Sequence, residues 1–160
     1  MKNAIKTIHI LGFAMLLGGT LGIIILNAVT NNSSDLVIIA NQSQIISTLV
    51  GWLVVPGAIT IMTSGLAMIL LRKLNPLKLH WLAIKLTLGV IVGASSAAIL
   101  APLSEKLATL AAQNSVHGLI TSEYEVLKGN QILFGYAIIG IILIITITSV
   151  YKPIFRRSAH

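Results

Sequence analysis

The stretch that decides the fold is Ile5–Val29, IKTIHILGFAMLLGGTLGIIILNAV, in which Lys6 is the only Asp, Glu, Lys or Arg residue. An α-helix needs about 20 mostly apolar residues to cross the hydrocarbon layer of a membrane, and this stretch is longer than that. It is also longer than the apolar part of a signal peptide, and no small-residue cleavage site follows it. We therefore expect a retained membrane-spanning helix.

Three further apolar stretches of similar length follow it, namely Ile45–Leu71, Leu79–Leu103 and Ile132–Tyr151. The chain has 160 residues, of which 56% are hydrophobic and 9% charged, whereas soluble domains contain about 25% charged residues. Strands of a membrane β-barrel are only about 10 residues long and alternate in polarity, which these stretches do not. The sequence predicts an all-α fold, a transmembrane four-helix bundle forming one integral membrane domain over residues 1–160.

The positive charges predict the orientation of this bundle in an inner (cytoplasmic) membrane. Short cytoplasmic loops are enriched in Lys and Arg, and this places both termini and the second loop in the cytoplasm. All four acids fall in the first and third loops, which are then outside. This distribution accounts for the net charge of +7 without any nucleic-acid partner. The eight cations on the cytoplasmic side are Lys2, Lys6, Arg72, Lys73, Lys78, Lys152, Arg156 and Arg157.

Helical periodicity predicts which faces of the spans contact one another. In the first span, Gly18 and Gly22 form the small-xxx-small pattern that lets membrane helices approach closely. Gly89 and Gly93 repeat this pattern in the third span. We expect close packing along both, and a homodimer seam is the alternative. A polar stripe lies on the opposite side of the first span and comprises His9, Phe13, Leu16, Thr20 and Asn27.

Breaks in the spans and loops are predicted from proline, glycine and polar residues. The Pro56-Gly57 pair should kink the second span, because proline removes a backbone hydrogen bond. In the third loop, Ser104–Gln113 could form a short amphipathic helix on the outer surface. Gly118 and the Gly129-Asn130 pair should interrupt the chain on either side of a polar segment.

Ionisable side chains inside a span are costly and usually serve a site. At a rise of 1.5 Å per residue, His9 lies about 6 Å beyond the inner boundary and Lys85 about 9 Å. Ser64 and Thr146 reach similar depths on the returning spans, and Met68 is close by. We therefore predict one polar layer in the cytoplasmic half, and no span contains a carboxylate for a proton relay or a hard-cation site.

The residue types in this layer restrict its chemistry. Without cysteine, the chain has no disulfide, thiolate metal site or covalently attached haem. One imidazole is too few ligands for zinc, but one histidine can hold a haem iron. His80 lies at the edge of its span and at another angle from Lys85, so we expect an interfacial residue there. The alternative for His9 is a structural histidine that bonds a neighbouring helix.

Two motifs resemble a group of small bacterial membrane proteins. These are Lys6-Thr7-Ile8-His9-Ile10-Leu11-Gly12 followed by Gly18-Gly19, and Pro56-Gly57 followed by Thr63-Ser64-Gly65-Leu66. The group includes the HemJ-type protoporphyrinogen oxidases, the CopD-like copper-resistance domain and the integral membrane family DUF2269. A third motif, Trp81-Leu82-Ala83-Ile84-Lys85-Leu86, resembles the Trp-Leu-His-Ala-Lys-Leu segment of the HemJ type.

The resemblance to the HemJ type implies roles for two residues. His9 matches the first-helix histidine that is taken as a haem b ligand, and Lys85 matches a lysine of the same site. Two positions depart from the HemJ pattern, since Ala83 replaces a histidine and Leu16 replaces a tryptophan. These departures bear on the oxidase activity more than on haem binding.

The sequence thus predicts a haem b-binding protein with a redox or tetrapyrrole-related role. His9 would be the axial metal ligand, and Lys85, as a catalytic or binding residue, would contact a propionate or substrate carboxylate beside Ser64 and Met68. Lipid and a homo-oligomer or larger membrane complex are the expected partners. One alternative is a non-catalytic subunit or scaffold of a larger complex. The other is copper or small-solute transport, whose only support is Met15, Met62 and Met68.

Overall fold

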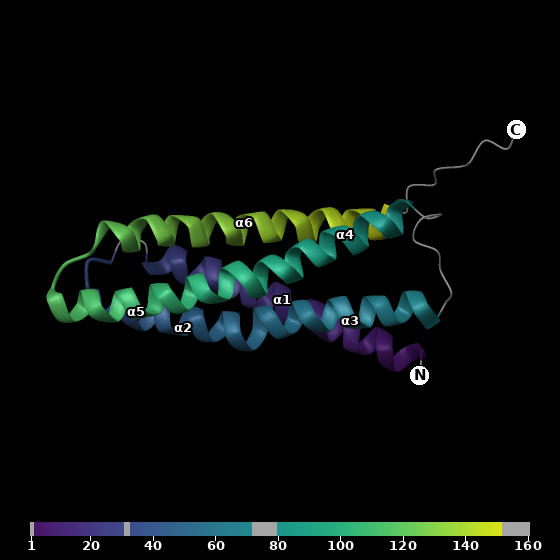
Figure 1. Ribbon diagram of the computed structural model, residues 1–160, viewed down its shortest axis with the longest axis horizontal. Coiled ribbons are helices and arrows are strands. Elements are labelled where there is room, and N and C mark those ends of the chain that lie inside the picture. The colour runs from purple at the N-terminus through teal and green to yellow at the C-terminus, as the bar shows by residue number, and fades with distance from the viewer. Residues whose placement is uncertain (1, 31–32, 72–79, 152–160) are drawn as a thin grey trace, which may run out of the picture.

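A computed structural model describes residues 2–30, 33–71 and 80–151 (Figure 1). This part of the chain is almost entirely helical. The first long helix is α1 (Lys2–Thr30), and the last is α6 (Ser122–Tyr151). Between them lie two helices that each contain a π-helical turn. They are α2 (Leu36–Leu49), η1 (Val50–Val54) and α3 (Val55–Leu71), and then α4 (His80–Ser95), η2 (Ser96–Leu100) and α5 (Ala101–His117).

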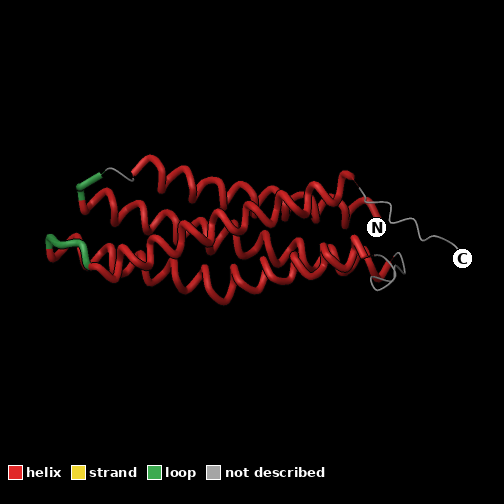
Figure 2. The backbone as a smooth tube through the Cα atoms, turned by 90° about the horizontal axis from the view of Figure 1, so that it is seen from above, coloured by secondary structure: helices red, strands yellow, loops and turns green. Residues whose placement is uncertain are grey.

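The four long helices lie side by side in one elongated bundle (Figures 1 and 2). α1 contacts α3, α2 and α6, while α4 contacts α3 and α6, and α5 packs against α2. We call the end where α1 begins the near end and the end where α5 gives way to α6 the far end. All four helices are long and apolar enough to cross a membrane. The predicted all-α four-helix architecture is confirmed.

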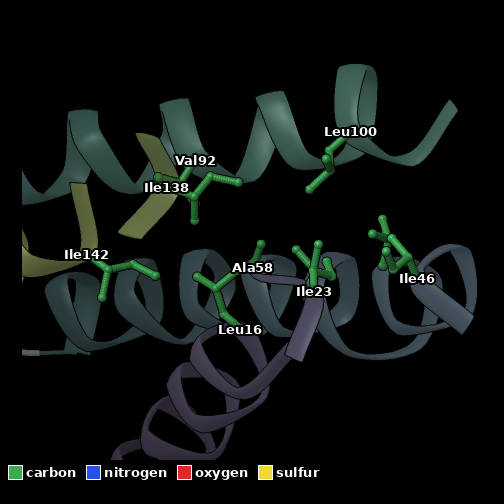
Figure 3. Close-up of a cluster of buried hydrophobic side chains, with 10 residues drawn as sticks. Leu16, Ile23, Ile46, Ala58, Val92, Leu100, Ile138 and Ile142 are labelled. Carbon is green, nitrogen blue, oxygen red and sulfur yellow. The ribbon is translucent and has the colours of Figure 1, made fainter. Parts of the chain in front are cut away.

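The core of the bundle is apolar along most of its length. Val54, Leu100 and Ile138 are at most 2% exposed in its middle, and Figure 3 shows side chains from all four long helices converging there. Large apolar side chains such as Ile10, Leu70 and Leu133 are exposed on the outside. A soluble protein mostly exposes polar side chains, whereas a chain in contact with lipid must expose apolar ones.

The predicted kink at Pro56 takes the form of a π-helical turn directly before it. Proline has no N–H to give to the carbonyl four residues earlier, and the chain widens here, with Val55 N–H bonding the Val50 carbonyl five residues back. The same arrangement recurs before Pro102, where Ala101 N–H bonds the Ser96 carbonyl. The two π turns contact each other.

The third loop differs from the sequence expectation. α5 continues from the third span to His117, so Ser104–Gln113 is part of a long helix and not a separate surface helix. Gly129-Asn130 lies inside α6 and does not interrupt the helix. The reason is tertiary packing, because Leu107 and Ala111 bury a face of α5 together with Ile39 of α2 and Tyr124 of α6.

The helices through α3 and α5 are also longer than a membrane requires. Each candidate span, Leu36–Leu71 and Leu82–His117, has 36 residues, or about 54 Å at 1.5 Å per residue. The hydrocarbon layer is only about 30 Å thick. α5 is the least apolar of the long segments and contributes Glu105 and Lys106 to its surface.

Close approach between α1 and α3 does not use the predicted glycines. A Cβ on Gly57 would lie 2.7 Å from the Leu16 backbone nitrogen, and one on Gly19 would lie 2.8 Å from Val54 Cγ2. Among the described residues, nothing lies within 4 Å of a Cβ built on Gly18, and a Cβ on Gly22 would reach only Leu49 Cδ1 at 3.4 Å. Within the chain, the packing predicted for Gly18 is not found, because the core contacts the polar stripe of α1 and leaves Gly18 on the outside.

The third span follows its predicted pattern only in part. Gly93 is buried against Met62, whose sulfur would collide with an added Cβ. Gly89, one turn earlier, meets nothing within 4 Å in the described part of the chain. Gly93 therefore makes room for the Met62 side chain, and Gly89 is not at a helix contact within the described residues.

The predicted break at Gly118 is confirmed, and it supports a testable prediction. Gly118 ends α5 with φ 70° and ψ 17°, a left-handed conformation, and its N–H donates to the Asn114 carbonyl at 2.9 Å. Side chains strain this conformation by about 1–2 kcal/mol. We expect Gly118→Ala to lower the free energy of unfolding by about that amount, as measured by denaturation in detergent.

Gly129→Ala provides the control for this prediction. Gly129 is an exposed helical residue with open space around its Cα, so alanine should leave stability unchanged or raise it by up to about 1 kcal/mol. Equal losses of stability in the two variants would contradict the role given to the left-handed turn.

Candidate functional site

His9 lies in the near half of the bundle, between α1 and α3. Its Nδ1 is 2.9 Å from Ser64 Oγ, and the ring rests on Gly65, where an added Cβ would lie 3.6 Å from His9 Cε1. The imidazole is half-buried and also interacts with the backbone of Ile61. The structure therefore brings together His9 and Ser64, which the sequence placed at one depth.

The hydrogen bonds of Ser64 are compatible with a proton on Nδ1 of His9. A serine hydroxyl has one hydrogen to donate. Ser64 Oγ donates to the carbonyl of Thr60 and lies 3.3 Å from that of Ile61. When the hydroxyl proton is directed to a carbonyl, Oγ can accept from His9 Nδ1–H. In that tautomer of the neutral ring, Nε2 has the lone pair.

Lys85 joins this pair from a third helix. It is half-buried on α4, and its ammonium group acts electrostatically on the His9 imidazole. The four acids of the chain are all at the far end, Asp35 before α2, Glu105 on α5, and Glu123 and Glu125 on α6. We call His9, Ser64 and Lys85 the near-end cluster.

The other residues predicted for this layer are placed differently. Met68 is half-buried on α3, one turn beyond Ser64. Thr146 Oγ1 donates to the Ile142 carbonyl of its own helix, so its hydroxyl is used locally. The prediction for the His80 side chain falls outside the described residues. Leu16, which stands where the HemJ type has tryptophan, is a core residue at 3% exposure.

Sequence reasoning missed the glycine beneath the imidazole. Gly65 lets the His9 ring lie against the backbone of α3, and Gly57 lets α1 approach the same face. The two glycines are eight residues apart, which at 3.6 residues per turn places them on one side of the helix. This spacing is visible in the sequence, but the small-xxx-small pattern of α1 indicated a different contact face.

The structure also limits the metal chemistry. In residues 2–30, 33–71 and 80–151, no group of three or more His, Asp or Glu side chains gathers in a way that could hold a metal ion. Of the methionines considered for copper, Met62 packs on Gly93, and Met15 lies beside Gly57. Both positions fill gaps between helices.

Comparison with known proteins agrees with this architecture. The chain matches a family described as a predicted integral membrane protein, DUF2269, over residues 3–153. No curated protein matches it, and no solved structure does. The match extends over all four long helices and the near-end cluster. The chain belongs to the DUF2269 family of predicted integral membrane proteins.

Proposed function

We propose that this membrane protein binds haem b through His9 Nε2 and takes part in redox or tetrapyrrole chemistry. The observation that supports this proposal is the hydrogen bond from His9 Nδ1–H to Ser64 Oγ. With Nδ1 bearing the hydrogen of this bond, the lone pair would be on Nε2, the nitrogen that would bind the iron. The near end would face the cytoplasm, because the cation-rich segments adjoin it.

The near-end cluster fits the requirements of such a ligand. Metal-binding histidines usually donate their second N–H to a fixed acceptor, which orients the ring and raises its basicity. Ser64 does this for His9, and Gly65 supports the ring from below. A single histidine is sufficient as a protein ligand, because the porphyrin supplies four nitrogens. Bound haem would supply one-electron chemistry at its iron.

Lys85 would pair with a negatively charged group of the ligand. A haem has two propionates, and a cation half-buried near His9 can pair with one of them. A propionate would accept a charge-assisted hydrogen bond from the Lys85 ammonium group. Lys85 would thereby orient the ring relative to His9, or hold the carboxylate of a tetrapyrrole substrate.

The test is a haem titration of the purified protein, followed by the Soret band. We expect a bound spectrum in the wild type and an affinity about 10–100-fold lower in Ser64→Ala, the range seen when a ligand's supporting hydrogen bond is removed. Thr63→Ala is the matched control, because Thr63 is exposed and its hydroxyl bonds carbonyls of its own helix.

Two results would overturn the proposal. One is a wild-type protein that shows no Soret band after reconstitution with haem. The other is equal haem affinity in Ser64→Ala and Thr63→Ala. Either result would leave the His9–Ser64 bond as a structural link between α1 and α3, which is the role expected of a non-catalytic membrane subunit.

A further inference from the structure

A second polar region lies in the far half of the bundle, separate from the near-end cluster. Each long helix contributes one buried polar side chain to it. Gln42 Nε2 donates to Asn27 Oδ1 at 3.1 Å, and Gln131 Nε2 donates to Ser104 Oγ at 2.9 Å. All four residues are at most 6% exposed. We call them the far polar layer.

Further buried polar groups lie on both sides of this layer. Towards the far end, Ser43 Oγ and Tyr124 Oη are 3.0 Å apart, and Ser43 also donates to the Ile39 carbonyl. Tyr124 is therefore the donor to Ser43. Asn114 is buried three residues before the end of α5, and Ser96 is buried in the π turn η2. The polar groups thus extend along the α5 side of the bundle from its end to its middle.

Three atoms in this region have no hydrogen-bond partner among the described residues. They are Gln42 Oε1, Asn114 Nδ2 and Ser96 Oγ, in side chains that are 4%, 4% and 0% exposed. A buried polar atom without a partner costs roughly 1–3 kcal/mol, and most such atoms in native proteins are paired with protein or with ordered water.

Ser96 differs from the other buried hydroxyls of the chain. Thr20, Ser43 and Ser104 each donate to the carbonyl four residues earlier. Ser96 lies in a π turn, where backbone bonds span five residues, and its neighbour Ser95 donates to the Val92 carbonyl at 3.2 Å. The hydroxyl of Ser96 is therefore left for a partner that is not a neighbouring carbonyl of its helix.

We infer that ordered water occupies the far polar region and completes the bonds of these three side chains. The unpaired atoms are an acceptor, a donor and a hydroxyl that can do either, and none is charged. A molecule that suits each of the three atoms is small and neutral and can both donate and accept. Water meets these conditions, and buried water typically makes about three such bonds.

The hydrated region ends at the middle of the bundle. Val54, Val92 and Ile138 are at most 3% exposed and form part of the apolar core. Apolar space of this kind stays dry. The water at Gln42 and Asn114 would therefore be reached from the far end, whereas Ser96 lies beyond the buried Leu100 and would hold a separate water. This inference does not depend on whether haem binds.

The test uses the full-length protein in nanodiscs and nuclear Overhauser transfer from water to side-chain amides. It is run at a pH where chemical exchange of these amides is slow. We expect cross-peaks from water to the Asn114 and Gln42 amides, with the sign of long-lived water. Asn114→Leu should remove the first set, which assigns it.

Thermal unfolding supplies the second readout. If water satisfies its hydroxyl, Ser96→Ala should leave the melting temperature unchanged or lower it. A dry, unpaired hydroxyl would instead be relieved by alanine, and the melting temperature would rise. Ser95→Ala is the neighbouring control. Either an absent water cross-peak at Asn114 or a higher melting temperature in Ser96→Ala overturns the inference.

Discussion

Changing His9 to alanine is expected to abolish the Soret band of the haem-loaded protein. The variant removes the only side chain that the near-end cluster offers as an iron ligand, since Ser64 and Lys85 are poor ligands for haem iron. The loss should therefore be complete within detection and not a change of a few-fold in affinity. The measurement is the visible spectrum after titration with haem b, compared at equal protein concentration.

The design separates loss of the ligand from loss of the fold. His117→Ala is the matched control, because His117 is an exposed histidine at the far end of α5 and should not affect the spectrum. His9→Gly gives a second arm, since added imidazole could occupy the space left above Gly65 and restore the band. A Soret band that persists unchanged in His9→Ala would exclude His9 as the ligand.

The sequence predicted the near half of the molecule better than the far half. Membrane spans are set by hydrophobic length, and this signal is strong enough to locate four helices in one sequence. The depth of His9 and Ser64 followed from counting residues along two spans, and their hydrogen bond agrees with it. The three-dimensional structure was needed only to identify which helices neighbour His9 and which glycine lies under its ring.

Residues 104–131 of the far half were predicted as a loop because their composition is mixed. Ser104, Gln131 and Tyr124 are polar residues in segments that contain charges, and periodicity alone does not reveal that they face one another. Their hydrogen bonds connect residues 27 and 81 positions apart in the chain. Long-range pairing of this kind overrides local composition, so buried polar groups there were read as surface groups.

The glycines show the same limit in a simpler form. A small-xxx-small pattern indicates that a helix has a smooth face, but it does not indicate which helix packs against that face. In α1, the contact face is set by the apolar and polar residues that pack inward, and Gly12 and Gly19 lie beside them. Gly57 of α3 is the position where the two backbones come closest.

Replacing Gly57 by alanine is accordingly expected to cause the largest loss of stability among single small substitutions. The new Cβ would lie 2.7 Å from Leu16 N and 2.9 Å from Gly12 O. Both atoms belong to the backbone of α1, so no side chain can turn aside, and the two helices must separate. Overpacking usually costs about 1–3 kcal/mol and occasionally more, and we expect Gly57→Ala to reach about 3 kcal/mol. The measurement is the free energy of unfolding in a detergent titration.

Gly18→Ala isolates the effect of position from that of the residue type. Gly18 is exposed on α1 with open space around it, and alanine in a helix interior is more stable than glycine by about 0.5–1 kcal/mol. The two variants should therefore change stability in opposite directions. If Gly18→Ala were the more damaging of the two, the close contact of α1 would lie on the Gly18–Gly22 face after all, and the packing of α1 on α3 through Gly57 would be wrong. Because His9 reaches Ser64 across that same α1–α3 contact, the comparison also tests the geometry on which the near-end cluster depends.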